Sequence, residues 1–233
     1  MDLESIISWT ATIIGFGLKA SPIVLFYKIA MGKEKIEIVP ELLIICNVLS
    51  AELWFNYWTQ KGNKMAPLIS SSVSLILGII FSFIYLYYFP NKKVGKFLLY
   101  IILESTSICL LFYGLNQIKV NYVGIMANIV NVITFFSPGQ RIIRVCKEKN
   151  YKLIPIVTTI LGCITSAGWL CFGILIKDIN AIIPNTISVI LALFNTTIWI
   201  YYYCKRKDED KKEKDNEEEM IETDKGDKDI NEV

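Results

Sequence analysis

Seven long apolar segments, separated by short polar stretches, constrain the fold of this 233-residue chain more than any other feature. A helix that crosses a bilayer needs roughly 20 mostly apolar residues, because a backbone polar group without a hydrogen bond is very costly in hydrocarbon. Charged residues or Asn, Gly and Pro bound each segment. We therefore predict an all-α integral membrane protein whose seven transmembrane helices cover residues 5–27, 38–60, 66–89, 95–115, 123–145, 153–176 and 181–203.

The composition of the chain supports this class. Hydrophobic residues make up 53% of it and its mean hydropathy is +0.45, which is too apolar for an ordinary soluble domain of this size. Residues 204–233 are different, because charges of both signs crowd there, and we predict a disordered, charged tail. The first segment has no basic flank before it and no small-residue cleavage site, so we expect it to stay in the mature protein.

The distribution of positive charge predicts the orientation. Cytoplasmic loops carry more Lys and Arg than the loops on the opposite side of a membrane. Fourteen Lys and Arg residues lie beside the spans on one side, within 28–35, 92–96, 141–152 and 205–207, and four lie on the other: Lys61, Lys64, Lys119 and Lys177. We predict that the N-terminus lies outside and the C-terminus in the cytosol, with the plasma membrane as the expected location and an internal membrane as the alternative.

The two ends of the apolar region resemble each other at a nearly constant offset. Like residues lie 116 positions apart at the first span, 115 at the second and 114 at the third. Transporters are often built from duplicated halves of this kind. The matched pairs are Pro22 with Pro138, Pro40 with Pro155, Trp54 with Trp169, Tyr57 with Phe172, and residues 76–78 with 190–192.

This repeat predicts the architecture. Each half contains an odd number of spans, so duplication alone would place the halves upside down relative to each other, and a span between them restores the same orientation. We predict a parallel 3+1+3 triple-helix-bundle repeat: a first repeat at 1–89, a linker helix at 90–120 and a second repeat at 121–203. A pseudo-two-fold axis would run along the membrane normal, with a central site between the halves.

Four prolines stand at similar depth in the predicted halves: Pro22, Pro40, Pro138 and Pro155. Proline lacks an N–H and its ring clashes with the carbonyl four residues earlier, so a proline makes a bendable point in a helix. A single proline is common in membrane helices. A symmetric set at a constant offset favours hinges around one mouth of a central pathway.

The paired tryptophans Trp54 and Trp169 lie several residues inside the ends of spans 2 and 6. A lone tryptophan at that depth is usually an interfacial residue. A symmetric pair suits the apolar C–H faces of a pyranose, while the neighbouring amide of Asn185 can bind its hydroxyls. We predict a binding site built from these residues.

At this point the sequence resembles the second half of a SWEET (MtN3/saliva) sugar transporter. The residues that carry the resemblance are Ser137-Pro138, Pro155, Trp169-x-x-Phe172-Gly173, Asp178 and Pro184-Asn185. The resemblance implies passive, bidirectional uniport of mono- or disaccharides by alternating access. It also implies that Trp54 and Trp169 hold the sugar, that the four prolines are cytosolic hinges, and that Tyr57, Phe172 and Asp178 form the outer gate.

The chain departs from the family pattern at three positions. At the 114 offset Ser71 is the counterpart of Asn185, at a position where the family usually has Asn. The serine hydroxyl lies on a shorter side chain, so we expect a weaker or water-mediated contact with the sugar. Phe172 replaces the common Tyr, and Trp58 replaces the Gly that often follows Tyr57.

Two charges, Lys19 and Glu52, fall within predicted spans, and their repeat counterparts are Phe135 and Ala167. A charge in the membrane normally faces a partner or a water-filled cavity. The two side chains can pair with each other, extend toward the nearest interface, or line the pathway and tune selectivity or proton coupling.

Other functional classes fit the residues less well. A proton-coupled PQ-loop exporter of amino acids or cystine is the alternative, although its Pro-Gln pairs are missing and the chain has no His. A seven-helix receptor would not require the internal repeat with its paired prolines, so the repeat argues against this class. We expect no enzyme, cofactor, metal site or nucleic-acid partner, since no phosphate loop, ligand cluster or CxxC pair occurs. A sugar and the lipid bilayer are the expected partners, and a homo-oligomer is compatible with the chain.

Overall fold

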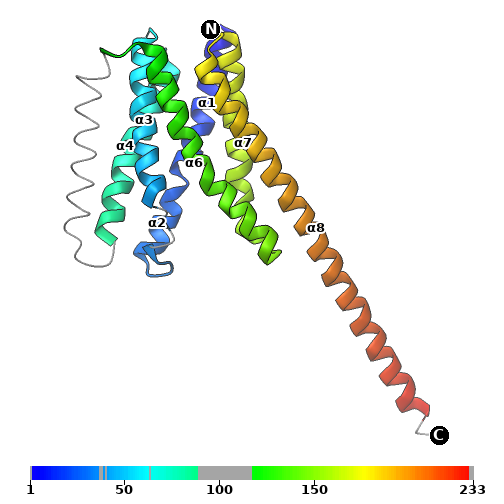
Figure 1. The fold of residues 1–233 in the computed structure, drawn as a ribbon. Helices are drawn as coiled ribbons and strands as arrows, with labels where there is room; N and C mark the ends of the chain where they lie inside the picture. The colour runs from blue at the N-terminus through cyan, green and yellow to red at the C-terminus, as the bar shows by residue number, and fades with distance from the viewer. Residues whose placement is uncertain (1, 37–38, 40, 63, 89–116, 231–233) are drawn as a thin grey trace.

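The computed structural model describes residues 2–36, 39, 41–62, 64–88 and 117–230. In these ranges the regular structure is helical, which confirms the predicted all-α fold (Figure 1). The predicted linker span at 95–115 lies outside the described residues. The helices are α1 (Leu3–Ala20), α2 (Pro22–Ala30), α3 (Glu41–Gln60), α4 (Met65–Tyr88), α6 (Val120–Glu148), a 3₁₀ turn (Tyr151–Leu153), α7 (Ile156–Leu175) and α8 (Ile179–Ile230).

Four helical segments in the described ranges are long and apolar enough to cross a membrane: Leu3–Ala30, Met65–Tyr88, Ile156–Leu175 and Ile179–Lys207. A shorter apolar helix covers Val120–Thr134. α3 occupies the predicted second span and carries the polar residues Asn47, Glu52 and Asn56. The described helices thus follow six of the predicted spans, and α3 contributes many of the buried residues.

The packing of the helices follows the predicted repeat. In the first half α4 packs against both α1 and α3, and in the second half α8 packs against both α6 and α7. The third helix of each half therefore contacts the other two. The halves meet along two seams, α1 with α7 and α3 with α6. The main apolar core lies between the halves, since it joins Leu53, Tyr57 and Trp58 of the first to Val123 and Phe172 of the second.

The predicted hinge prolines occupy three different settings. Pro22 is the first residue of α2, directly after α1 ends, and at this break the Ser21 N–H bonds the Leu18 carbonyl at 3.1 Å. Pro138 lies within α6, while Pro40 is outside the described residues. Pro155 precedes α7 as its N-cap, where a missing N–H removes no helical bond. Pro155 therefore begins a helix and is not a hinge within one.

The charged segment after residue 203 also differs from the prediction. The structure continues α8 through this segment to Ile230, and Figure 1 shows it as one long helix that leaves the bundle. Lys and Glu, which dominate residues 204–225, are strong helix formers, and no proline interrupts them. An existing helix end also removes the nucleation step that an isolated segment would need.

The seam between α1 and α7 depends on small residues. A Cβ added at Gly168 would lie 2.8 Å from Ala11 Cβ, and one added at Gly15 would lie 3.2 Å from the Thr165 methyl group. Ala11 is 2% exposed. Because lipid is as apolar as the helix surfaces, close backbone approach and packing must hold such helices together.

This seam gives a first prediction. Gly168→Ala should force α1 and α7 apart and destabilise the protein by about 1–3 kcal/mol, the usual cost of overpacking. The matched control is Gly17→Ala, because a Cβ at Gly17 meets nothing within 4 Å. Thermal unfolding of the purified protein in detergent should show a lower midpoint for Gly168→Ala alone. Equal midpoints for the two variants would contradict the role given to this contact.

Candidate functional site

A cavity of about 530 Å³ lies between the two halves. Its lining includes all four residues that the repeat and the family pattern predict for a binding site: Trp54, Ser71, Trp169 and Asn185. Trp54 and Ser71 come from α3 and α4, whereas Trp169 and Asn185 come from α7 and α8. The fold therefore brings residues from both halves of the sequence to one space.

The walls that α4 and α8 contribute are related position by position. On α8 the lining residues follow the spacing i, i+3, i+4 and i+7, which places them on one helical face. α4 has the same four positions and extends the lining with Leu77, Gly78 and Phe81. Each lining residue on α8 has a lining counterpart on α4 at the 114 offset. The pairs are Pro67 with Ala181, Ser70 with Pro184, Ser71 with Asn185, and Ser74 with Ser188.

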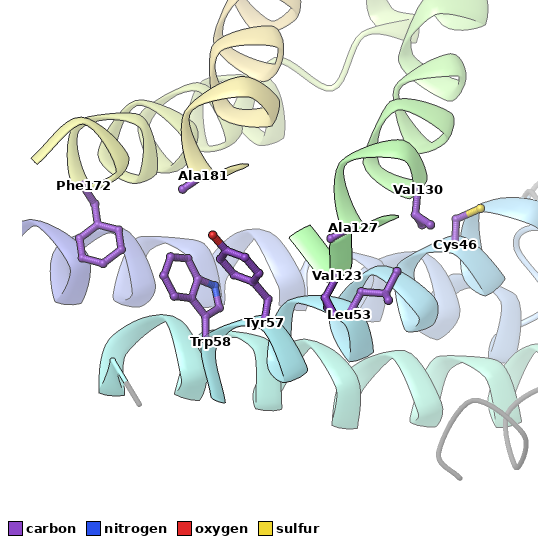
Figure 2. Close-up of a cluster of buried hydrophobic side chains, with 9 residues drawn as sticks. All are labelled: Cys46, Leu53, Tyr57, Trp58, Val123, Ala127, Val130, Phe172 and Ala181. Carbon is purple, nitrogen blue, oxygen red and sulfur yellow. The ribbon is translucent and has the colours of Figure 1, made fainter. Parts of the chain in front are cut away.

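Three tryptophans, Trp54, Trp58 and Trp169, line the cavity. Trp58 stacks on Trp54 with ring centroids 6.1 Å apart, and it contacts Phe172 at 5.8 Å. Phe172 in turn meets Trp169 edge-on at 5.6 Å. Figure 2 shows Trp58 and Tyr57 of α3 beside Phe172 of α7. These contacts form a continuous aromatic wall from one predicted tryptophan to the other, and Trp58, the departure from the family pattern, is its centre.

The predicted polar contacts are oriented by their own helices. The Asn185 amide nitrogen donates to the Ala181 carbonyl at 2.7 Å, and the Ser71 hydroxyl donates to the Pro67 carbonyl at 2.8 Å. These bonds use donors, so the amide oxygen of Asn185 and the lone pairs of Ser71 are suited to accept hydrogen bonds from a ligand. A polyhydroxylated molecule offers such donors.

Polar residues on α3 and α6 complete the lining and were not predicted. Ser50 donates to the Asn131 side-chain oxygen at 2.6 Å, which joins the two halves, and Asn47 lies one turn earlier on α3. Their signal in the sequence is only their polarity within apolar segments, which is costly unless the side chains face a polar space.

A buried polar network lies next to the aromatic wall, where Tyr57 contacts both Trp54 and Trp58. The Tyr57 hydroxyl lies 2.7 Å from both carboxylate oxygens of Asp178, and Lys61 forms an ion pair with Asp178 at 3.3 Å. The Asn180 backbone N–H also donates to Asp178 at 3.1 Å. Asp178 is 2% exposed, so these contacts compensate a desolvated charge.

This network includes two residues of the predicted outer gate, Tyr57 and Asp178, while the third, Phe172, packs in the adjacent aromatic wall. Lys61 and Asn180 were not predicted. α6 approaches them closely at Gly124, since a Cβ there would lie 2.7 Å from the Asn180 side chain and 2.8 Å from Tyr57. The glycine lets the second half cover the network.

The two intramembrane charges have different positions. Lys19 lines the cavity, and its ammonium donates to the carbonyl and the hydroxyl of Ser70, each at 2.6 Å. Glu52 is 2% exposed and lies outside the lining. In the described part of the chain, the contacts of Lys19 are with neutral groups, so the structure does not pair it with Glu52.

Comparison with known proteins identifies the family. The family model described as "Sugar efflux transporter for intercellular exchange" matches residues 5–93 and again residues 121–208. The chain belongs to this family, the SWEET or MtN3/saliva transporters. The two matches begin 116 residues apart, as the internal repeat predicts. Membership places this SWEET chain among transporters rather than enzymes.

Individual relatives agree with the assignment. The SWEET chain is 27% identical to "Bidirectional sugar transporter SWEET8" of Arabidopsis thaliana over 87% of its length and 89% of that protein. It is 25% identical to "Sugar transporter SWEET1" of Dictyostelium discoideum over 84% of its length and 92% of that protein. A solved structure of a eukaryotic SWEET transporter superposes with a TM-score of 0.77 at 17% identity, covering 87% of this chain and 100% of the other. That superposition supports the triple-helix-bundle fold.

The buried network gives a second prediction. Tyr57→Phe should remove the donor to Asp178 and lower stability by about 1–3 kcal/mol, because a buried carboxylate then loses a hydrogen bond. Tyr122→Phe is the control, since Tyr122 is 61% exposed on α6. Thermal unfolding in detergent should separate the two variants. If Tyr57→Phe unfolds at the wild-type midpoint, the network does not contribute as its geometry implies.

Proposed function

We propose that this protein carries mono- or disaccharides across a membrane as a passive, bidirectional uniporter that works by alternating access. The observation that carries the proposal is the cavity between the halves, which both tryptophans line and where each lining residue of α8 has a counterpart on α4. Its volume of about 530 Å³ falls within the range of small-molecule sites. The proposal also draws on the names of relatives, which are sugar transporters.

In this proposal the sugar ring lies against Trp54 and Trp169, whose flat faces suit its apolar C–H surfaces. Its hydroxyls donate to the Asn185 amide oxygen and to Ser71. Ser74 and Ser188 lie one turn further along α4 and α8 and add hydroxyl groups to the same walls. Each contact is an ordinary hydrogen bond, which suits a transporter that must also release its substrate.

Alternating access requires two arrangements of the halves. In the described arrangement the network of Tyr57, Lys61 and Asp178 closes one end, and we assign that end to the outside. Opening it requires these bonds to break while the opposite end closes. Pro22 lines the cavity at the break between α1 and α2, and we assign the hinge on that side to it. We assign Pro40, Pro138 and Pro155 to the same side as further hinge residues. Pro155 would act there at the start of a helix.

Passive transport fits the composition of the cavity better than proton coupling. Among the described lining residues there is no Asp or Glu that could take up a proton at the substrate. The proton-coupled exporter is therefore not favoured.

Apolar side chains such as Ile13, Val157 and Leu193 are more than half exposed on the outer surface, as contact with lipid tails requires. The plasma membrane and a homo-oligomeric state belong to the same proposal.

Uptake of radiolabelled glucose and sucrose into proteoliposomes tests the sugar pocket. Trp169→Ala and Asn185→Ala should each reduce uptake by about tenfold or more, since each removes a contact of about 1–3 kcal/mol. Trp199→Ala and Asn121→Ala are controls, because neither residue lines the cavity. Ser71→Asn should maintain or increase uptake by supplying the longer amide. Wild-type rates for both cavity variants would exclude this pocket.

Cysteine labelling in sealed cells tests the orientation. A cysteine at Lys147, in a variant without the native cysteines, should react with an impermeant reagent only after the membrane is permeabilised. A cysteine at Lys119 should react directly. The opposite labelling pattern would invert the topology and would assign the closed network to the cytosolic side.

A further inference from the structure

The ammonium group of Lys19 is a feature that a pocket for a neutral sugar does not require. Lys19 is at the end of α1 and lines the cavity. Its Nζ atom lies 2.6 Å from both oxygens of Ser70 and 5.8 Å from the centre of the Phe16 ring. These partners are neutral. They orient the ammonium toward the cavity walls without cancelling its charge.

Nothing else described in the lining cancels that charge. The lining residues of the described chain include no carboxylate, and Glu52 is buried outside the lining. The Asp178 carboxylate lies beyond the aromatic wall and is bound by Lys61 and Tyr57. The cavity therefore carries a local positive charge in a low-dielectric region, where an opposite charge on a ligand is attracted strongly.

The position of Lys19 joins this charge to the proposed sugar pocket. Ser70, which holds the ammonium, precedes Ser71 on α4, and both residues line the cavity with Trp54. The repeat counterpart of Lys19 is Phe135, so the second half supplies no matching cation at the 116 offset. A ligand with one charged end would thus bind in one orientation.

We propose that the cavity binds sugar monocarboxylates in preference to neutral sugars, with the sugar ring against the tryptophans and its carboxylate on Lys19. The inference rests on the proposed sugar transport and specifies its substrate class. A carboxylate brings one negative charge and matches one ammonium. A phosphate monoester carries about −1.5 to −2 at neutral pH and would leave unbalanced negative charge in the membrane.

D-Glucose and D-glucuronate differ only at C6, which is a hydroxymethyl group in one and a carboxylate in the other, so they isolate the effect of charge. Binding to the purified full-length protein can be followed by tryptophan fluorescence, with glucose uptake measured in parallel. We expect glucuronate to bind about tenfold or more tightly than glucose, the effect of one charge-assisted hydrogen bond. Glucose 6-phosphate should bind less tightly than glucuronate.

Three variants assign the preference to Lys19. Lys19→Gln should abolish the preference for glucuronate, and Lys19→Arg should retain most of it. Lys28→Gln is the matched control, because Lys28 is exposed on α2 outside the lining, and it should behave as the wild type. Using the ratio of the two affinities makes the comparison independent of the amount of folded protein.

The outcomes separate this inference from the function on which it rests. Glucuronate binding no tighter than glucose, alongside normal glucose uptake, overturns the inference and leaves the proposed transport intact. Retention of the preference in Lys19→Gln, or tighter binding of glucose 6-phosphate, also overturns it. Absence of uptake for any sugar, with glucuronate preference intact, contradicts the transport function instead.

Discussion

Close approach of the two halves along seams of small residues is the contact on which the rest of this structure depends. In a bilayer the hydrophobic effect does not drive helices together, so packing at Gly168 against Ala11, and at Gly124 against Tyr57, must do so. These seams join α1 to α7 and α3 to α6. Where the halves are not in contact, the polar faces of α4 and α8 border a cavity.

The same seams explain why costly polar groups are tolerated. The Asp178 carboxylate is buried within a membrane protein, yet Tyr57, Lys61 and the Asn180 backbone surround it with donors. The Asn180 bond is local, whereas the Tyr57 and Lys61 contacts depend on α3 lying against the α7–α8 turn. A movement of one half relative to the other would therefore change packing and electrostatics together, as expected for an element with two discrete arrangements.

Three departures from exact symmetry lie at the cavity. Ser71 faces Asn185, Trp58 adds a ring that stacks on Trp54, and Lys19 has no cationic counterpart in the second half. The two-fold repeat places the cavity between the halves, and the residues that differ between the halves determine which groups a ligand can contact. A symmetric pocket would bind a substrate equally well in two orientations, whereas these three residues make the two walls different.

The sequence by itself determined the class of the fold, because bilayer thickness sets the length of an apolar helix and a constant offset between like residues reveals a repeat. It also indicated Trp54, Ser71, Trp169 and Asn185, since transporters built from repeats place their binding site at the interface of the halves. Only the tertiary structure decided the rest. Lys61 reaches Asp178 across 117 positions, and Lys19 reaches Ser70 rather than Glu52, because these contacts depend on how helices from separate parts of the chain face each other, which periodicity does not encode. The helical end of α8 likewise depends on continuation from a span already formed, in addition to the helix propensity of its Lys and Glu residues.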